Sequence, residues 1–260
     1  MVQTPAIPQV LYPDSDGKPM ADNTIQYRWI VRLATNLKWL LKDQTAFVAG
    51  DLLWHPVQVE VPPAPSQAPD VMVVMGRPDR DRGSYKQWEE ENIAPQVVFE
   101  ILSPSNTARE MLAKQTFYEE HGVLEMFFYD PESYDFWGLV RNHPKEDFSP
   151  ITPLSFPWSS PLLKIRFELF EDGLAVFYPN GERFKEPGEF IQERDQAQKE
   201  RDQAQKERDQ AQKERDQAQK ERDQAQKERD QAQKERDQAQ QERDRALAKL
   251  RELGIDPGQL

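Results

Sequence analysis

Two acidic residues of this chain stand at positions where a charge is unusual. Glu100 lies inside the apolar run 97–103, and Asp70 directly precedes the apolar run 71–75. An unpaired buried carboxylate is costly, so Glu100 requires a compensating cation or hydrogen bonds. If the two runs pair as strands of one sheet, the carboxylates come together and offer the oxygen ligands that Mg²⁺ prefers. The alternatives are a turn residue at Asp70 and a solvated edge-strand carboxylate at Glu100.

A helix is expected directly after the run that carries Glu100. Thr107 and Glu110 have the spacing of a capping box, and Gly122 is a natural stop, which predicts a helix over residues 108–121. Lys114 falls within the apolar stripe of this helix, the side that faces a sheet. The sequence therefore predicts a lysine that points toward the two acids.

Three residues of the predicted helix share one face. Glu110, Lys114 and Tyr118 follow one another at intervals of four residues. A lysine beside a metal-bound phosphate stabilises the charge that develops during phosphodiester cleavage. The alternatives are a snorkelling stem for Lys114, core packing for Tyr118 and helix capping alone for Glu110.

Five short motifs occur in order along the first two thirds of the chain. They are Pro69-Asp70, Phe99-Glu100-Ile101-Leu102-Ser103-Pro104-Ser105, Lys114-x-x-x-Tyr118, Gly122-Val123-x-Glu125 and Tyr129-Asp130-Pro131. With this order and spacing, the chain resembles the Uma family, described as putative restriction endonucleases, a branch of the PD-(D/E)XK nuclease superfamily. The similarity covers about residues 20–185.

The resemblance implies an α+β, restriction-endonuclease-like core: a mixed β-sheet flanked by helices, with β-hairpins. It also implies Mg²⁺-dependent hydrolysis of the phosphodiester bonds of DNA, with Mn²⁺ as the alternative ion. In that reaction Asp70, Glu100 and the Ile101 carbonyl would hold the metal. Lys114 would complete the catalytic set by steadying the nucleophile or the phosphorane, with Tyr118 and Glu110 as supporting residues.

The chain departs from the pattern of this superfamily at two positions. Leu102 stands where the namesake motif has a lysine, so in this branch the lysine has moved to the helix as Lys114. Glu110 stands where relatives commonly have an aspartate, which keeps the charge on a longer side chain.

Composition narrows the remaining function classes. The chain has no cysteine and three scattered histidines, which excludes disulfides and a zinc-ligand cluster and fits a reducing cytoplasm. We find no signal-peptide pattern and no apolar run approaching about 18 residues, and so expect a soluble cytoplasmic protein with no membrane span.

The chain changes character near residue 190. From Glu193 the heptad Glu-Arg-Asp-Gln-Ala-Gln-Lys occurs six times without error through Lys234, and once more with a Gln at its last position. These residues favour helix, and we expect a long charged C-terminal helix. Alanine supplies only half of a coiled-coil seam, so both a solvated single helix and a homo-oligomer through residues 193–253 are open. The expected domains are a loose arm at 1–20, a nuclease-like domain at 21–190 and a helical tail at 191–260.

Net charge complicates binding to DNA. The formal net charge is −12, of which −11 falls before Glu193, so a phosphate backbone is repelled overall. The basic residues of the best candidate contact loop are Arg77, Arg80, Arg82 and Lys86. A plain solvated loop is the alternative. An alternative for the whole protein is an inactive nuclease fold that acts as an assembly or interaction module through its tail.

Other segments complete the expected core. Residues Ile30, Leu33, Leu37 and Leu40 predict an amphipathic helix. The runs 126–129 and 163–170 predict strands, with turns at 171–173 and 179–181, and the stretch 143–162 predicts an ordered loop.

Overall fold

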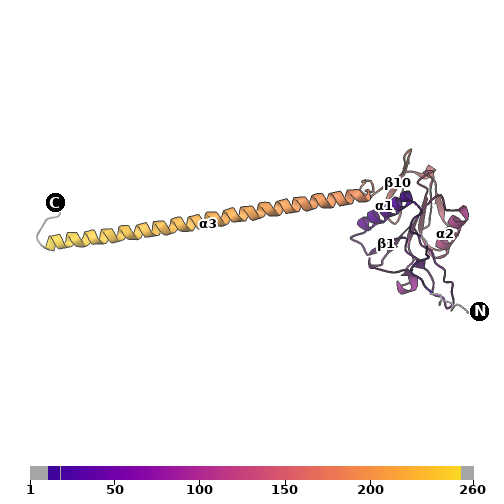
Figure 1. The fold of residues 1–260 in the computed structure, drawn as a ribbon, viewed down its shortest axis with the longest axis horizontal. Helices are drawn as coiled ribbons and strands as arrows, with labels where there is room; N and C mark the ends of the chain where they lie inside the picture. Colours follow the sequence, from indigo (N-terminus) through magenta and orange to yellow (C-terminus); the bar gives the residue numbers. More distant parts are fainter. Residues whose placement is uncertain (1–10, 18, 253–260) are drawn as a thin grey trace, which may run out of the picture. The chain divides into compact units, whose positions relative to one another are not determined.

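The computed structural model describes residues 11–17 and 19–252 (Figure 1). The described chain divides into two units, with the boundary between Ile191 and Gln192. The first unit is an α+β domain, and the second belongs to a long helix. The predicted fold class, a mixed sheet flanked by helices and followed by a long charged helix, is confirmed.

Six strands form the main sheet, in the order β1-β3-β5-β6-β7-β8. Their bounds are β1 Ala46–Gly50, β3 Val71–Met75, β5 Val97–Ile101, β6 Glu125–Tyr129, β7 Phe136–Val140 and β8 Ser149–Ile151. Only β5 and β6 pair in parallel; the other neighbours of this sheet are antiparallel. A parallel pair needs a crossover connection. The helix α2, Ala108–Glu120, supplies it and is thereby fixed next to the end of β5.

The side chains of β5 alternate between two apolar clusters. Val97, Phe99 and Ile101 belong to the cluster that includes the buried face of α1. Val98 belongs to the opposite cluster, together with Tyr118 of α2. Figure 1 shows α1 and α2 on either side of the strands. This alternation puts Glu100, two residues after Val98, on the side of the sheet that α2 covers.

The helix α1, Thr24–Leu40, confirms the predicted amphipathic helix. Its N-cap is Asn23, whose side chain accepts hydrogen bonds from the backbone N–H groups of Ile25 and Gln26. Its predicted apolar residues are buried or half-buried against the sheet.

The helix α2 begins and ends close to the predicted residues. The capping box is present in both directions, with the Thr107 backbone N–H donating to Glu110 Oε2 over 2.9 Å. The helix ends at Glu120, followed by Gly122 with a φ of +98°, a conformation that favours glycine. The Arg141 guanidinium donates to the Glu119 carbonyl over 2.7 Å, which satisfies one of the last carbonyls of the helix.

Smaller elements surround the main sheet. A second, antiparallel sheet contains β9 Trp158–Ser159, β10 Arg166–Phe170 and β11 Gly173–Phe177, and a two-stranded parallel sheet contains β2 Trp54–His55 and β4 Tyr85–Lys86. Two short 3₁₀ turns, Gln87–Glu89 and Pro153–Ser155, complete the domain. The predicted hairpin turn at 171–173 joins β10 to β11.

The predicted loop over residues 143–162 is wrong in part. This stretch contains the strands β8 and β9, which pair with β7 and β10 respectively. Neither strand has an alternating apolar pattern of its own, because Pro and Ser occupy several positions. Their partners supply the pairing, so the local sequence carries little signal for it.

Residues 11–17 of the arm predicted to be loose contact the domain. The Tyr12 hydroxyl donates to the Val59 carbonyl over 2.7 Å and accepts from the Val59 N–H over 2.6 Å. A ring nitrogen of the buried His55 lies 2.9 Å from the Pro13 carbonyl. Residues 1–10 and 18 of this arm lie outside the described residues.

The helix α3, Pro187–Glu252, contains the heptad repeats. Its side chains from 192 to 246 are exposed. Glutamine amides link successive turns, as in Gln196 Nε2 to Glu200 Oε1 at 2.8 Å and Gln198 Nε2 to Asp202 Oδ1 at 2.7 Å. Self-association through 193–253 stays a prediction, and residue 253 lies outside the described part. Among the described helices, none is long and apolar enough to cross a membrane.

Candidate active site

The register of β3 and β5 brings the two predicted acids together. The strands are antiparallel, with Val71 opposite Phe99. One step further along this register places Asp70 opposite Glu100 on the same face of the sheet. Only 7% of the Asp70 surface and 2% of the Glu100 surface are exposed. Like charges directly opposite each other in a sheet are destabilising, so this pair needs compensation from elsewhere.

Two side chains of α2 compensate Glu100. Lys114 Nζ donates to Glu100 Oε2 over 2.6 Å, and the Tyr118 hydroxyl donates to Glu100 Oε1. Burial by itself would lower the pKa of Lys114, but the charges of Glu100 and Asp70 outweigh burial and raise this pKa above its ordinary value. Burial, followed by the charge of Glu100, raises the pKa of Tyr118. Lys114 is therefore charged and Tyr118 neutral in this contact.

Asp70 has a different environment from Glu100. Its Oδ2 accepts a hydrogen bond from the Ile101 N–H over 2.6 Å, whereas Oδ1 receives none from the described part of the chain. Burial and then the charge of Glu100 raise the pKa of Asp70 to about 8, although Lys114 acts in the opposite direction. The ionised form of Asp70 is thus disfavoured in this environment, and a bound divalent cation would favour it.

A chain of hydrogen bonds holds the carbonyl that was predicted as a metal ligand. Gln26 Nε2 of α1 donates to the Ile101 carbonyl over 2.8 Å, and Gln26 Oε1 accepts from the Asp22 N–H over 2.8 Å. The carboxylate of Asp22 accepts in turn from the hydroxyls of Ser103 and Ser105. The start of α1 is therefore tied to the turn after β5, and the Ile101 carbonyl is held in place. A carbonyl oxygen has a second lone pair, which a cation can use.

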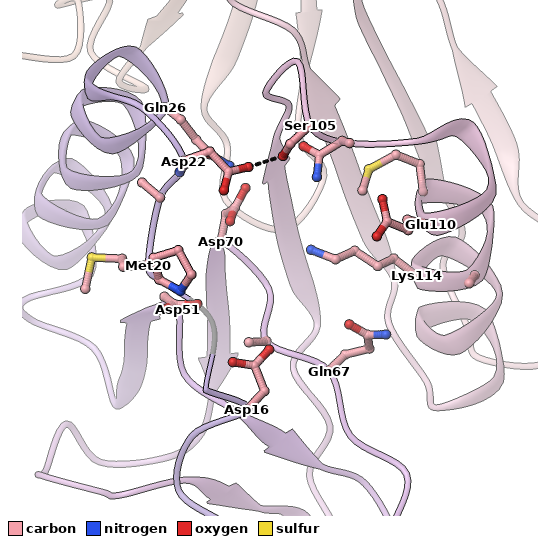
Figure 2. Close-up of a pocket in the computed structure, with 16 residues that line it drawn as sticks. Asp16, Met20, Asp22, Gln26, Asp51, Gln67, Asp70, Ser105, Glu110 and Lys114 are labelled. Carbon is pink, nitrogen blue, oxygen red and sulfur yellow. Dashed lines mark hydrogen bonds between the residues drawn. The ribbon is translucent and has the colours of Figure 1, made fainter.

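Asp70 and Lys114 border a cavity of about 460 Å³ between α1 and α2, and Glu100 lies behind Lys114, in contact with its ammonium group. Figure 2 shows Asp70 between the two helices, with Lys114 extending toward it from α2. The cavity is acidic, because Asp16, Asp51 and Glu110 also line it. Glu110, predicted as a supporting residue, therefore both caps α2 and borders the cavity.

The sequence reasoning did not identify Asp51, Gln26 and Asp22 as residues of this region. Asp51 follows β1 and its N–H donates to the Asp70 carbonyl over 3.2 Å. Its pKa is raised, first by burial. An acid directly after an apolar run was the available signal for Asp51. The Ser-Pro-Ser motif indicated that Ser103 has a hydrogen-bond partner. It did not indicate that this partner is Asp22, which lies 81 residues away in the sequence.

The donor set suits a hard divalent cation. Asp70, Glu100 and the Ile101 carbonyl offer oxygen atoms, and Asp70 Oδ1 is available at the cavity. Within residues 11–17 and 19–252, no three His, Cys, Asp or Glu side chains are arranged to hold a metal. Mg²⁺ retains several waters and commonly uses one or two carboxylates plus substrate phosphates, so two carboxylates and a carbonyl fit this ion.

The loop that was predicted to contact DNA has an internal partner. The carboxylate of Glu90, which is 3% exposed, accepts from Arg77 Nε over 3.0 Å, from Arg80 over 2.6 Å and from Arg82 Nε over 2.8 Å. Hydrogen bonds, the largest from Arg82, lower the pKa of Glu90 to about 2. The guanidinium of Arg82 also lies 4.0 Å from the ring centre of Phe47. These bonds give the arginines a structural role.

Contact of this loop with DNA stays a prediction. Arg80 is the arginine of the group that reaches solvent most, with 57% of its side chain exposed. Lys86 lies half-buried in β4. These two residues are the ones best placed to meet a phosphate backbone, whereas Arg77 and Arg82 are committed to Glu90.

The domain thus combines an α+β core with two buried carboxylates and a lysine, and Asp70 and Lys114 line one cavity. The chain belongs to the Uma2 family, described as "Putative restriction endonuclease", whose family model matches residues 19–168. The family resemblance predicted from the motifs is confirmed.

No curated protein matches the chain. A similar solved structure is titled a putative nuclease belonging to DUF820 from Anabaena variabilis ATCC 29413. It has 17% identity and a TM-score of 0.40 over 56% of this chain and 77% of its own.

Replacing Glu90 by Gln should destabilise the domain by about 3 kcal/mol at neutral pH, because three guanidinium groups lose their buried counter-charge. Since the folded-state pKa of Glu90 is lowered to about 2, its stabilisation is complete above about pH 4.5 and is lost as the pH falls toward 2. The difference in free energy of unfolding between the wild type and the variant, measured with urea, should therefore narrow in acid.

Glu91→Gln is the matched control, because this neighbour also pairs with Arg77 but is 75% exposed. It should change stability by less than about 0.5 kcal/mol. Equal losses in the two variants would contradict the role of Glu90.

Asp70→Asn should stabilise the metal-free protein at alkaline pH. The folded-state pKa of about 8 lies above the ordinary value, so the stability contributed by neutral Asp70 is complete below about pH 4 and is lost as the pH rises through 8. In EDTA at about pH 9 the variant should be more stable by ~1–3 kcal/mol in urea unfolding, and this difference should shrink as the pH falls and vanish near pH 4. Asp172→Asn, in an exposed turn, is the control. A gain that does not depend on pH would show that the charge of Asp70 is not its cause.

Proposed function

We propose that this protein is a divalent-cation-dependent endonuclease that hydrolyses phosphodiester bonds of DNA, with Mg²⁺ as the ion and Mn²⁺ as the alternative. The observation that carries the proposal is that Asp70 and Lys114 line one cavity while the buried Glu100 lies opposite Asp70 in the sheet and binds Lys114. Membership of a family of putative restriction endonucleases supports the reaction class. Asp70, Glu100 and the Ile101 carbonyl would hold the ion. When bound, it would lower the pKa of a water molecule and offset negative charge on the phosphate.

The protein's own residues would orient and stabilise the reacting groups. Lys114 is 21% exposed and borders the cavity, so its ammonium can donate to a phosphate oxygen that gains charge. Tyr118 touches only the Glu100 carboxylate among these groups and is therefore a positioning residue. Gln26 has the same kind of role for the Ile101 carbonyl.

Substrate binding must overcome an acidic protein. The cavity is lined by several carboxylates besides Asp70, and the net charge before Glu193 is −11. Nonspecific affinity for nucleic acid comes mainly from Lys and Arg contacts to phosphate. We therefore assign the backbone contact to the exposed Arg80 and to Lys86, and expect weak binding in the absence of the divalent ion.

Plasmid cleavage tests the proposal. Purified full-length protein should nick or linearise supercoiled DNA with Mg²⁺ or Mn²⁺, and EDTA should abolish the reaction. Asp70→Asn, Glu100→Gln and Lys114→Ala should each reduce the rate by about 10²-fold or more, since each removes a charge beside the reacting phosphate. Urea unfolding should confirm that each variant is folded.

Matched controls separate the site from general effects of mutation. Glu125→Gln changes a buried glutamate of the adjacent strand that binds Ser160 and the Leu162 N–H outside the cavity. Lys38→Ala changes a helical lysine of α1 that pairs with Asp79. Both should cleave at rates near that of the wild type. If folded wild-type protein were inert on single-stranded and double-stranded DNA and RNA with either ion, the nuclease proposal would fail. The assembly role of the helical tail would then take precedence.

A further inference from the structure

Both oxygens of the Glu100 carboxylate already have partners within the chain. Lys114 Nζ lies 2.6 Å from Oε2, and the Tyr118 hydroxyl is bound to Oε1. Glu100 is 2% exposed, so solvent has little part in satisfying it. A divalent cation that uses Glu100 as a ligand must therefore share or replace one of these two contacts.

Of the two partners, Tyr118 is the fixed one. It is fully buried, and its ring stacks on Trp54 with centroids 6.4 Å apart and 8° between the planes. Phe117 contacts its ring edge-on at 6.0 Å. A tyrosine in this packing cannot leave Glu100 without opening the core. Its hydroxyl is also neutral, so it does not repel a cation that approaches the carboxylate.

Lys114 is the partner that can move. Its ammonium ends a flexible four-carbon stem, its side chain is 21% exposed, and it borders the cavity that Asp70 also lines. An ammonium and a divalent cation on the same carboxylate oxygen would repel each other strongly at this depth. Among the described residues that line the cavity, Lys114 is the one cation, and it is the cation bound to Glu100, so the repulsion falls on it.

We propose that Lys114 is an internal counter-cation for Glu100 that a divalent cation displaces from Oε2. The inference rests on the proposed function, because it concerns the same metal site. In the metal-free protein the lysine balances the buried charge of Glu100, which lies opposite Asp70 in the sheet. Binding of the ion takes over that task and turns the ammonium toward the cavity, where a substrate phosphate would lie. The lysine is thus presented to the substrate only after the ion is in place.

Calorimetric titration with Mn²⁺ tests the competition. Lys114→Met removes the displaced charge, so the Kd for Mn²⁺ should fall by about tenfold or more relative to the wild type. Tyr118→Phe leaves the charge in place and should not tighten binding. Lys38→Met removes a lysine of α1 that does not line this cavity and should change the Kd by less than about twofold. If Lys114→Met does not fold, Lys114→Gln, which keeps a neutral donor, should also tighten binding. An unchanged or raised Kd in the folded Lys114 variant would overturn the proposal.

Nitrogen-15 NMR of lysine ammonium groups separates displacement from simple repulsion at a distance. The Lys114 resonance, assigned by its loss in Lys114→Met, should be observable in EDTA because the salt bridge protects it from exchange. It should shift or broaden as Mg²⁺ saturates the protein, with the midpoint found by a calorimetric titration with Mg²⁺. A resonance that stays unchanged at saturating Mg²⁺ would show that Lys114 remains on Glu100 and would refute displacement.

The outcomes distinguish this inference from the proposed function. Tighter Mn²⁺ binding by Lys114→Met and a shifted ammonium resonance, without any DNA cleavage, would support displacement and reject the nuclease proposal. Metal-dependent cleavage by the wild type with no tightening in the variant would reject displacement alone. Absence of Mn²⁺ binding in both wild type and variant would overturn the displacement mechanism and the metal site together.

Discussion

Two carboxylates that face each other across neighbouring strands are the constraint on which this domain depends. Asp70 and Glu100 are nearly excluded from solvent, and burial with mutual repulsion raises the pKa of Asp70 to about 8. A sheet built for stability alone would place apolar residues at both positions. The domain instead keeps the pair and surrounds it with a lysine, a tyrosine and a backbone N–H. Such a local cost is typical of a functional site.

The rest of the domain holds in place the groups that stabilise the two buried carboxyl groups. The capping box at one end of α2 and Arg141 at the other hold the helix that carries Lys114 and Tyr118. On the opposite side, Gln26 of α1 holds the Ile101 carbonyl. Because β5, α2 and β6 form one parallel crossover, the acid and its lysine are separated by only 14 residues and one turn. Glu100 and Lys114 therefore meet within one short stretch of sequence, whereas Asp70 is brought to them by the pairing of β3 with β5.

Some of the arginines in the first unit form ion pairs with a buried carboxylate, while other basic residues lie on its surface. Three arginines of one loop converge on the buried Glu90. The helical tail has almost balanced charge, and its glutamines link successive turns to the carboxylates of the next turn. The net charge before Glu193 is −11, which disfavours the approach of a phosphate backbone. The divalent ion would therefore contribute to substrate binding as well as to chemistry.

The sequence by itself determined the local elements and the candidate residues of the site. Capping residues located α2, apolar runs located β3 and β5, and the lone charge of Glu100 indicated the candidate site, because these signals depend on near neighbours. Only the tertiary structure decided the rest. The register that opposes Asp70 to Glu100, the reach of Gln26 to Ile101 and the binding of three arginines by Glu90 all join residues from different elements. The weak strands β8 and β9 likewise exist through their partners. No local pattern encodes such contacts, since their free energy arises only when the chain has folded.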